Sequence, residues 1–290
     1  MKNTSVIDAC ILILASAVIS SSAQTQTYSH GREVRSHPNC PIVAKNCVCE
    51  DAIEGGSNIL CPDREHYDIH IHYKEPHQVF LKCNSRTRNG QPLHSTDVIY
   101  QLRNLTVSHV EWLQLVNCPI PTGSISAFMN AMRSRGLKGL HIVYGRFDES
   151  NEALVSNQFL GLENLTNIRI ERSRFTNIEK AAFHGLNNLQ YLWIKSNNVK
   201  EIDMDAFLPL TNLQHLVLFE RSLSRLPSGL LQAQKELKSL EISFKKISSL
   251  DKEFFRNNVK LSELILRDLT LYSSLKNAMK LVVFLVSLIF

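Results

Sequence analysis

Five leucines recur at intervals of 24 residues in the second half of the chain, and this fixed period constrains the fold more than any other feature. They are Leu165, Leu189, Leu213, Leu237 and Leu261. Each opens the same pattern, with further apolar residues three and five positions later, and two looser copies open at Leu137 and Val110. A period of this length indicates a repeat array in which each unit packs only against its neighbours.

Each unit has the pattern of a short strand followed by a longer return. The apolar residues at offsets 0, 3 and 5 predict a strand whose alternate side chains enter a core. An irregular or helical stretch, anchored at offset 18 by residues such as Phe183 and Phe207, would close the unit. We therefore expect an α/β leucine-rich repeat solenoid, or horseshoe, over residues 110–270. Its units would start at residues 110, 137, 165, 189, 213, 237 and 261.

One repeat position departs from the usual pattern. At offset 8, an asparagine or cysteine side chain commonly bonds to buried turn backbone. The units carry Cys118, Gly145, Ser173, Asn197, Arg221, Lys245 and Leu269 there. Because Arg221 and Lys245 cannot lie unpaired in a core, we expect a bulge or outward turn at both. The solenoid should be less regular over residues 220–248.

All seven cysteines lie before residue 119. Any structure that they stabilise therefore lies on the amino-terminal side of most of the repeats. Residues 1–23 have the pattern of a secretory signal peptide, with Lys2, an apolar stretch over residues 9–19 and small residues at Ser21 and Ala23. Cleavage after Ala23 would remove Cys10 and leave an even number of cysteines in an oxidising compartment. We expect the chain to enter the secretory pathway and to reach the cell surface or the extracellular space.

The remaining six cysteines indicate a stapled cap over the open end of the repeat core. They are Cys40, Cys47, Cys49, Cys61, Cys83 and Cys118. Alternating apolar residues predict two strands, over residues 67–73 and 79–83, and we expect a linker at 24–39 and the cap at 40–109. Six cysteines allow fifteen pairings. A zinc site is disfavoured because free thiolates do not persist in a secreted chain, and we expect neither a metal nor a cofactor.

The cap and the repeats after it resemble the amino-terminal part of an insect Toll receptor ectodomain. The runs that carry the resemblance are CPIVAKNCVC at 40–49, ILCP at 59–62, FLKCN at 80–84 and LVNC at 115–118. It covers residues 40 to about 268. It implies the disulfides Cys40–Cys49, Cys47–Cys61 and Cys83–Cys118. It also implies a receptor module of innate immunity or development that binds a Spätzle-like cystine-knot cytokine, and it allows a receptor dimer.

The chain departs from that family beyond its repeats. It has no carboxy-terminal cysteine cap, no standard transmembrane helix and no TIR domain, so we expect that it cannot signal alone. It would be a fragment, a truncated gene model or a secreted short form. We favour the interpretation that the apolar tail at 271–290 is non-native sequence that replaced the next repeat. A weak membrane anchor, or an element packed over the open solenoid end, is the alternative.

The alternative function is a secreted structural or decoy leucine-rich repeat protein that binds matrix proteins or glycans. Catalysis is disfavoured, because the chain has no phosphate-binding glycine loop, no local pair of carboxylates and no G-x-S-x-G motif. The net charge of +5 is spread without long runs of one sign, which gives no clustered nucleic-acid footprint.

The ligand should bind on the strand face that points away from the core, expected to be concave. Offsets 2, 4 and 6 of each strand form this face, and both tryptophans fall on it. The predicted contact residues are Trp112, Gln114, His141, Arg169, Glu171, Tyr191, Trp193, Lys195, Val217 and Phe219. An aromatic centre with a charged rim is typical of a protein-binding hot spot. A covering sugar or neighbouring chain, or repeats out of phase, is the other explanation.

Two further features carry weaker predictions. Sequons at Asn104 and Asn164 would carry surface sugar. Asp68, His70 and His72 alternate onto one strand face, a spacing that could chelate a metal or sense pH. We favour a solvated outer face of a cap strand for these three residues.

Overall fold

The computed structural model describes residues 48–52, 56–60, 69–74, 77–86, 91–103, 105, 107–147, 153–243, 254–267 and 287–289. All belong to one compact unit, Ser36–Phe290. Several expectations lie outside the described residues: the signal peptide, the linker, Cys40, Cys47, Cys61, Asp68 and the Asn104 sequon.

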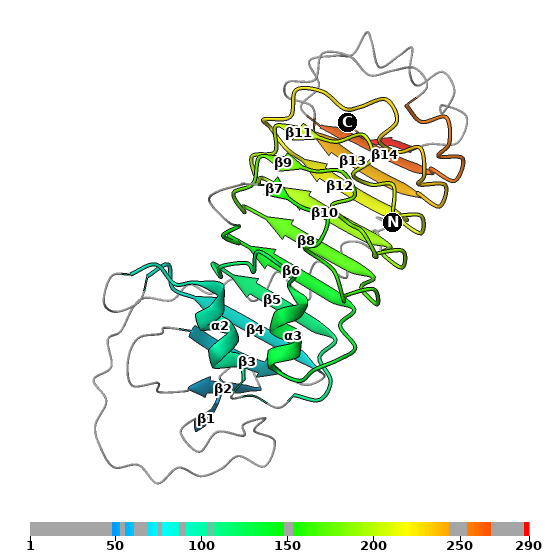
Figure 1. Ribbon diagram of the computed structural model, residues 1–290. Coiled ribbons are helices and arrows are strands. Elements are labelled where there is room, and N and C mark those ends of the chain that lie inside the picture. Colours follow the sequence, from blue (N-terminus) through cyan, green and yellow to red (C-terminus); the bar gives the residue numbers. More distant parts are fainter. Residues whose placement is uncertain are drawn as a thin grey trace. The chain divides into compact units, whose positions relative to one another are not determined.

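Seven short strands lie side by side in one parallel sheet (Figure 1). They are β5 (Trp112–Val116), β6 (Gly139–Val143), β8 (Asn167–Glu171), β10 (Tyr191–Lys195), β12 (His215–Phe219), β13 (Ser239–Ser243) and β14 (Glu263–Arg267). Each begins two residues after the start of a repeat unit. Equal offsets pair across neighbouring strands, as Leu192 does with Leu216. This register places the apolar positions of all units in common rows on the core side.

The amino-terminal cap extends the same sheet with antiparallel strands. These are β1 (Val48–Asp51), β2 (Ser57–Leu60), β3 (Ile69–Lys74) and β4 (Gln78–Cys83). Each pairs antiparallel with the next, and β4 then pairs parallel with β5. The two expected cap strands correspond to β3 and β4, whereas β1 and β2 were not foreseen. Because β4 continues directly into the parallel sheet, the cap and the repeats share one core.

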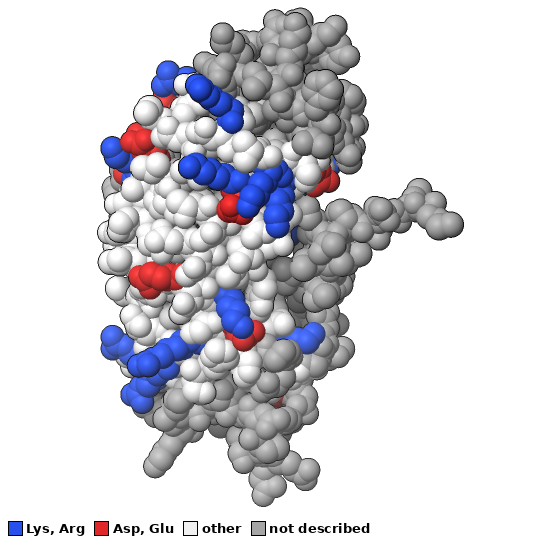
Figure 2. Space-filling view, turned by 90° about the vertical axis from the view of Figure 1, so that its right-hand side faces the viewer, with Lys and Arg blue, Asp and Glu red and all other residues white. Residues whose placement is uncertain are grey.

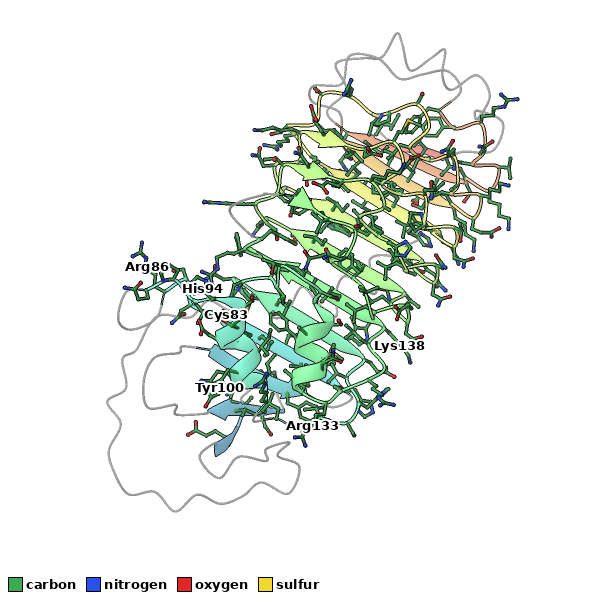
Figure 3. The ribbon with its side chains drawn as sticks, viewed as in Figure 1. Cys83, Arg86, His94, Tyr100, Arg133 and Lys138 are labelled. Carbon is green, nitrogen blue, oxygen red and sulfur yellow. A yellow bond between two sulfur atoms is a disulfide. The ribbon has the colours of Figure 1, made fainter. Side chains whose placement is uncertain are left out.

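A disulfide joins the cap to the first repeat, and it is the expected pair Cys83–Cys118. Cys83 ends β4, where Figure 3 labels it. The two Cα atoms are 4.8 Å apart. Asn117 reinforces the junction, because its side-chain Nδ2 donates to the Cys83 carbonyl at 2.9 Å. The other two implied disulfides lie outside the described residues.

Two short helices, α2 (Ser95–Leu102) and α3 (Ser126–Ala131), contact each other and lie over one face of the sheet near β3–β5 (Figure 1). The first turn of α2 is closed by Asp97, whose Oδ2 accepts from the His94 backbone N–H at 2.9 Å. Val98 and Leu102 are then buried on one side of α2. The sequence did not predict a helix inside the cap.

The core is filled by the repeated apolar positions and by a row of phenylalanines. Phe159, Phe183 and Phe207 are fully buried, and adjacent rings in this row have centroids 5.6 Å apart. A small parallel sheet of β7 (Ala153–Leu154), β9 (Asn177–Ile178) and β11 (Glu201–Ile202) adds further buried side chains. Burying such rings is worth roughly 1.5–3 kcal/mol each, so each repeat is held mainly by contact with its neighbours.

In the tail, β15 (Ser287–Ile289) pairs parallel with β14 and extends the large sheet. Of the three alternatives for the tail, this pairing corresponds to an element placed over the open solenoid end. The tail residues on either side of β15 lie outside the described residues.

A ladder of buried hydrogen bonds joins successive turns after the strands. The Gly145 N–H donates to Ser173 Oγ at 2.9 Å, and the Ser173 N–H donates to Asn197 Oδ1 at 2.9 Å. In the next turn the acceptor is the carboxylate of Glu220, which is 1% exposed and lies 2.8 Å from the Asn197 N–H nitrogen. Arg221 is exposed. A residue at offset 7 therefore fills the position that offset 8 fills in the preceding units.

The expectation of irregularity over residues 220–248 is wrong for the strands of the large sheet, whereas the small parallel sheet does not continue past β11 into residues 225–226. Strands β12, β13 and β14 keep equal offsets opposite one another, with His215 opposite Ser239 and Ser239 opposite Glu263. The strand stack is thus regular, because Glu220 supplies the buried acceptor and frees Arg221 to point outward. Residues 244–248, and with them Lys245, lie outside the described residues.

Candidate functional site

The residues at offsets 2, 4 and 6 lie on the face of the large sheet that is turned away from the core, here called the outer face. In β5, β8 and β10 the second and fourth residues are buried, and the others are partly or fully exposed. The strand alternation predicted from the sequence is therefore present in these three strands, whereas in β12 the predicted contact residue Val217 is buried. Side chains of the outer face lie in straight rows, because equal offsets pair across strands.

Seven of the predicted contact residues meet on β8, β10 and β12, and we call them the Trp193 patch. They are Arg169, Glu171, Tyr191, Trp193, Lys195, Val217 and Phe219. Trp193 pairs with Arg169 on one side and with Val217 on the other. Lys195 is placed in the same way between Glu171 and Phe219. Tyr191 lies in a further row at offset 2, and the other six residues form two adjacent rows that place cations beside aromatic rings.

Trp193 is held between two cations. The Arg169 guanidinium carbon lies 4.5 Å from the centroid of its ring, and Lys195 Nζ lies 5.7 Å from it. Arg169 is fixed from behind by an ion pair with Glu171. Cation–π contacts of this kind contribute about 0.5–2 kcal/mol, so the indole ring is held in one orientation before any partner arrives.

The second row centres on Phe219. Lys195 Nζ lies 5.3 Å from its ring centroid, and the Arg267 guanidinium carbon lies 5.8 Å from it. Arg267 also donates from Nε to Glu241 Oε1 at 2.6 Å. Lys195, in contrast, has no carboxylate partner among the described residues. It is a cation that is oriented by two rings and is free of an ion pair within the described part of the chain.

An aromatic stack borders the patch. The rings of Tyr191 and His215 are parallel to within 2°, with centroids 4.4 Å apart. Tyr191 remains 39% exposed. Burial, followed by the nearby Lys238 ammonium, lowers the pKa of His215. The imidazole is therefore neutral near pH 7 and serves as a flat support for Tyr191.

Three predicted contact residues, Trp112, Gln114 and His141, lie on the same face but outside the patch, on β5 and β6. The Trp112 ring lies flat on Gly139, where an added Cβ would approach Cε3 to 2.1 Å. Burial, followed by the Arg169 charge, lowers the pKa of His141 to about 3. Both of its ring nitrogens lack a hydrogen-bond partner among the described residues.

Three residues of the site were missing from the predicted set: His215, Glu241 and Arg267. All three occupy offsets 2, 4 or 6, so the alternation itself contained the signal. Arg267 reaches Phe219 across β13, where Ser243 is small and buried. Contacts across an intervening strand cannot be read from spacing within one repeat.

The other candidate sites are less developed. In the cap, His72 Nδ1 lies 3.1 Å from Asn58 Oδ1. The described residues contain no cluster of three or more His, Cys, Asp or Glu side chains suited to a metal ion.

Asn164 is exposed, as a sugar acceptor must be. Within the described segments, no helix combines the length and apolar character needed to cross a bilayer.

The comparison with family models agrees with the geometry. Residues 163–223 match the model described as Leucine rich repeat. The fold is a leucine-rich repeat solenoid. The matched residues include β8, β10 and β12, so the Trp193 patch lies within the leucine-rich repeats. A search of curated proteins found no match.

Among solved structures, the chain is similar to ectodomains of Toll type. A glycosylated Toll–Spatzle complex of Drosophila aligns at 16% identity and a TM-score of 0.44, covering 82% of this chain and 37% of that one. A second structure of that complex aligns at 15% identity and a TM-score of 0.25, covering 77% and 47%. A complex of TLR13 with ssRNA13 aligns at 14% identity and a TM-score of 0.32, covering 60% and 34%. The chain spans less than half the length of each.

Proposed function

We propose that this leucine-rich repeat chain is an extracellular ligand-binding module and that the Trp193 patch contacts a protein ligand. The single observation that carries the proposal is the arrangement of Trp193 between Arg169 and Lys195. Tryptophan, tyrosine and arginine are the residues most enriched in binding hot spots. Cations already stacked on rings lower the entropic cost of binding.

The ligand that we propose is a cystine-knot cytokine of the Spätzle type. Support comes from the resemblance of the cap motifs to Toll receptors and from the Cys83–Cys118 disulfide, which suits an oxidising compartment. Because Lys195 has no ion-pair partner among the described residues, the ligand should present a carboxylate beside an apolar side chain. By this proposal the chain acts in innate immune or developmental signalling, at the cell surface or as a soluble form.

The test is a titration of a purified dimeric cystine-knot cytokine over the immobilised chain by surface plasmon resonance. Trp193→Ala removes the central ring, and we expect affinity to fall by about 2 kcal/mol, roughly thirtyfold. Lys195→Ala should cost less and should also reduce the dependence of affinity on salt.

The matched control is Tyr100→Ala, which removes an aromatic ring that is 56% exposed on α2, labelled in Figure 3. It should leave the affinity unchanged. The proposal fails if Trp193→Ala, shown to be folded by its thermal transition, binds the cytokine as tightly as the Tyr100 variant. Saturable binding of matrix proteins without cytokine binding would instead favour a structural or decoy protein.

A further inference from the structure

A second surface lies along the edge of the sheet where the strands end, and we call it the strand-end edge. It consists of residues 172–176, 196–200 and 221–225, which follow β8, β10 and β12 and lie at the arrowheads in Figure 1. Backbone bonds stack these turns. The Arg172 N–H donates to the Lys195 carbonyl at 3.0 Å, and the Lys200 N–H donates to the Thr176 carbonyl at 2.7 Å.

The strand-end edge carries five exposed cations and no carboxylate. The cations are Arg172, Arg174, Lys200, Arg221 and Arg225. Glu171, which directly precedes the first segment, is paired with Arg169. Glu220, which precedes the third segment, is buried, and both of its oxygens accept N–H groups of residues 197–199. The exposed Glu201 directly follows the second segment. None of the five cations has an ion-pair partner among the described residues. Arg172 is positioned by Tyr144, whose hydroxyl oxygen accepts from Nη1 at 2.9 Å.

A hollow of about 380 Å³ opens on this edge between the turns after β8 and β10. Its lining consists of Arg172, Ser173, Arg174, Thr176, Ser196, Asn197 and Asn198. None of these side chains is acidic. Ser173 and Asn197 already donate within the protein, Ser173 Oγ to the Glu171 carbonyl and Asn197 Nδ2 to the Ile170 carbonyl. Ser222 Oγ donates to Asn198 Oδ1 at 2.7 Å, so the amide NH2 of Asn198 is the group left for a ligand. Two guanidinium groups with hydroxyl and amide donors suit an oxyanion such as sulfate.

The opposite edge, which precedes the strands, differs in its charges. There Lys138 Nζ lies 2.8 Å from Glu111 Oε1, and Lys260 Nζ lies 2.7 Å from Glu236 Oε1. Figure 2, which views that side of the molecule, shows blue groups beside red ones as well as blue groups without a red neighbour. Two cations of the opposite edge are thus paired with carboxylates, whereas none of the five exposed cations of the strand-end edge is, among the described residues.

We propose that the strand-end edge binds a linear sulfated glycan, with one sulfate group in the hollow between Arg172 and Arg174. Neighbouring strands are about 4.8 Å apart, so three stacked turns present cations over roughly 10 Å along the repeat direction. A linear polyanion can contact all three turns at once. The disulfide Cys83–Cys118 favours an oxidising compartment, where sulfated glycans are the common linear polyanions. This site is independent of the Trp193 patch.

The experiment measures binding of a heparin hexasaccharide to the full chain by microscale thermophoresis at several salt concentrations. We expect affinity to fall steeply with salt and to be lost with fully desulfated heparin. The variant Arg172→Gln/Arg174→Gln should bind about tenfold more weakly. The control Lys138→Gln/Lys260→Gln removes the same charge from the opposite edge and should bind within twofold of the unchanged chain. Trp193→Ala should not alter this affinity, which separates this site from the proposed cytokine site.

The proposal is overturned if desulfated heparin or hyaluronan binds as well as heparin, or if the two double variants lose affinity equally. Equal or tighter binding of a single-stranded RNA of the same charge would also overturn it, since the site would then recognise charge alone. Thermal unfolding of both variants verifies that each is folded, so a loss confined to the Arg172→Gln/Arg174→Gln variant supports the assignment.

Discussion

The carboxylate of Glu220 is hydrogen-bonded to both the backbone N–H and the side-chain amide of Asn197, with Oε1 at 2.8 Å and 2.9 Å. The same amide of Asn197 donates to the Ile170 carbonyl, and its Oδ1 accepts from the Ser173 N–H. A buried chain of hydrogen bonds therefore passes through three successive turns. One acidic side chain thus accepts the backbone N–H groups of the turn in the neighbouring repeat.

Glu220 should make stability depend on pH. Burial raises the pKa of its carboxyl above 4.5, although N–H groups of residues 197–199 act in the opposite direction. The folded chain then keeps the proton while the unfolded chain releases it, so the contribution of this group is present at low pH and is lost as pH rises through the raised pKa. Glu220→Gln cannot titrate. We expect the free energy of unfolding of the parent, measured relative to that of this variant, to fall as pH rises above 4.5.

Urea denaturation at each pH measures this difference. Glu179→Gln, which changes an exposed glutamate, is the matched control and should track the parent chain. A constant offset between the parent and Glu220→Gln across the range would contradict the prediction.

His141 should have the opposite pH dependence. Its pKa is lowered from 6.5 to about 3, first by burial and then by Arg169. As pH falls below 6.5, His141 becomes protonated in the unfolded chain but stays neutral in the folded chain. The free energy of unfolding that this group contributes above pH 6.5 is therefore lost progressively toward pH 3. His141→Gln should abolish this loss, which is on the order of a few kcal/mol. Unfolding free energies at pH 7 and pH 4 decide the matter, and equal acid sensitivity of both chains would refute it.

Gly139→Ala should disturb the outer face at Trp112. The added Cβ would lie 2.1 Å from Trp112 Cε3, so the ring must move. We expect a loss of about 1–3 kcal/mol in stability. In a Trp193→Phe background, the emission of the remaining Trp112 should shift, because the ring leaves its place on the backbone. Gly123→Ala, whose Cβ would meet nothing within 4 Å, is the control. An unshifted spectrum with unchanged stability would show that the face tolerates the methyl group.

Removal of the Cys83–Cys118 disulfide should destabilise the junction of cap and repeats. The bond closes a sequence separation of 35 residues. The loop entropy released in the unfolded chain is then worth about 3–4 kcal/mol. Replacing both residues by alanine avoids leaving buried thiols. Urea unfolding of the double variant measures the loss, and a difference below about 1 kcal/mol would argue that the buried cap strands hold the junction without it.

The strand positions and the core could be predicted because they depend on a local period. Each apolar row needs only residues such as Leu192 and Leu216 at equal offsets. Helix α2 was missed because its eight residues give a short amphipathic pattern inside a cysteine-rich segment. Glu220 was missed for another reason. Its burial depends on N–H donors about 23 residues away in the preceding repeat, and no rule within one repeat contains them.

The sequence predicted which residues lie in the candidate site, but it did not predict which of them contact one another. Alternation along β10 placed Tyr191, Trp193 and Lys195 on the outer face. Which cation lies over which ring depends on side-chain length and on the neighbouring strands. Arg267 reaches Phe219 across the intervening strand, where Ser243 is small and buried.

Phe183 and Phe207 are 24 residues apart, one buried ring in each of two successive repeats, and this spacing determines how such a chain can change length. A second copy of residues 189–212 would add one strand and one buried ring without altering the pairing of the strands on either side. Insertion of only part of a unit would disrupt both the pairing of equal offsets between strands and the row of phenylalanine rings. Genes of this kind can therefore grow or shrink by whole units of 24 codons, and the binding face grows with them by one strand at a time.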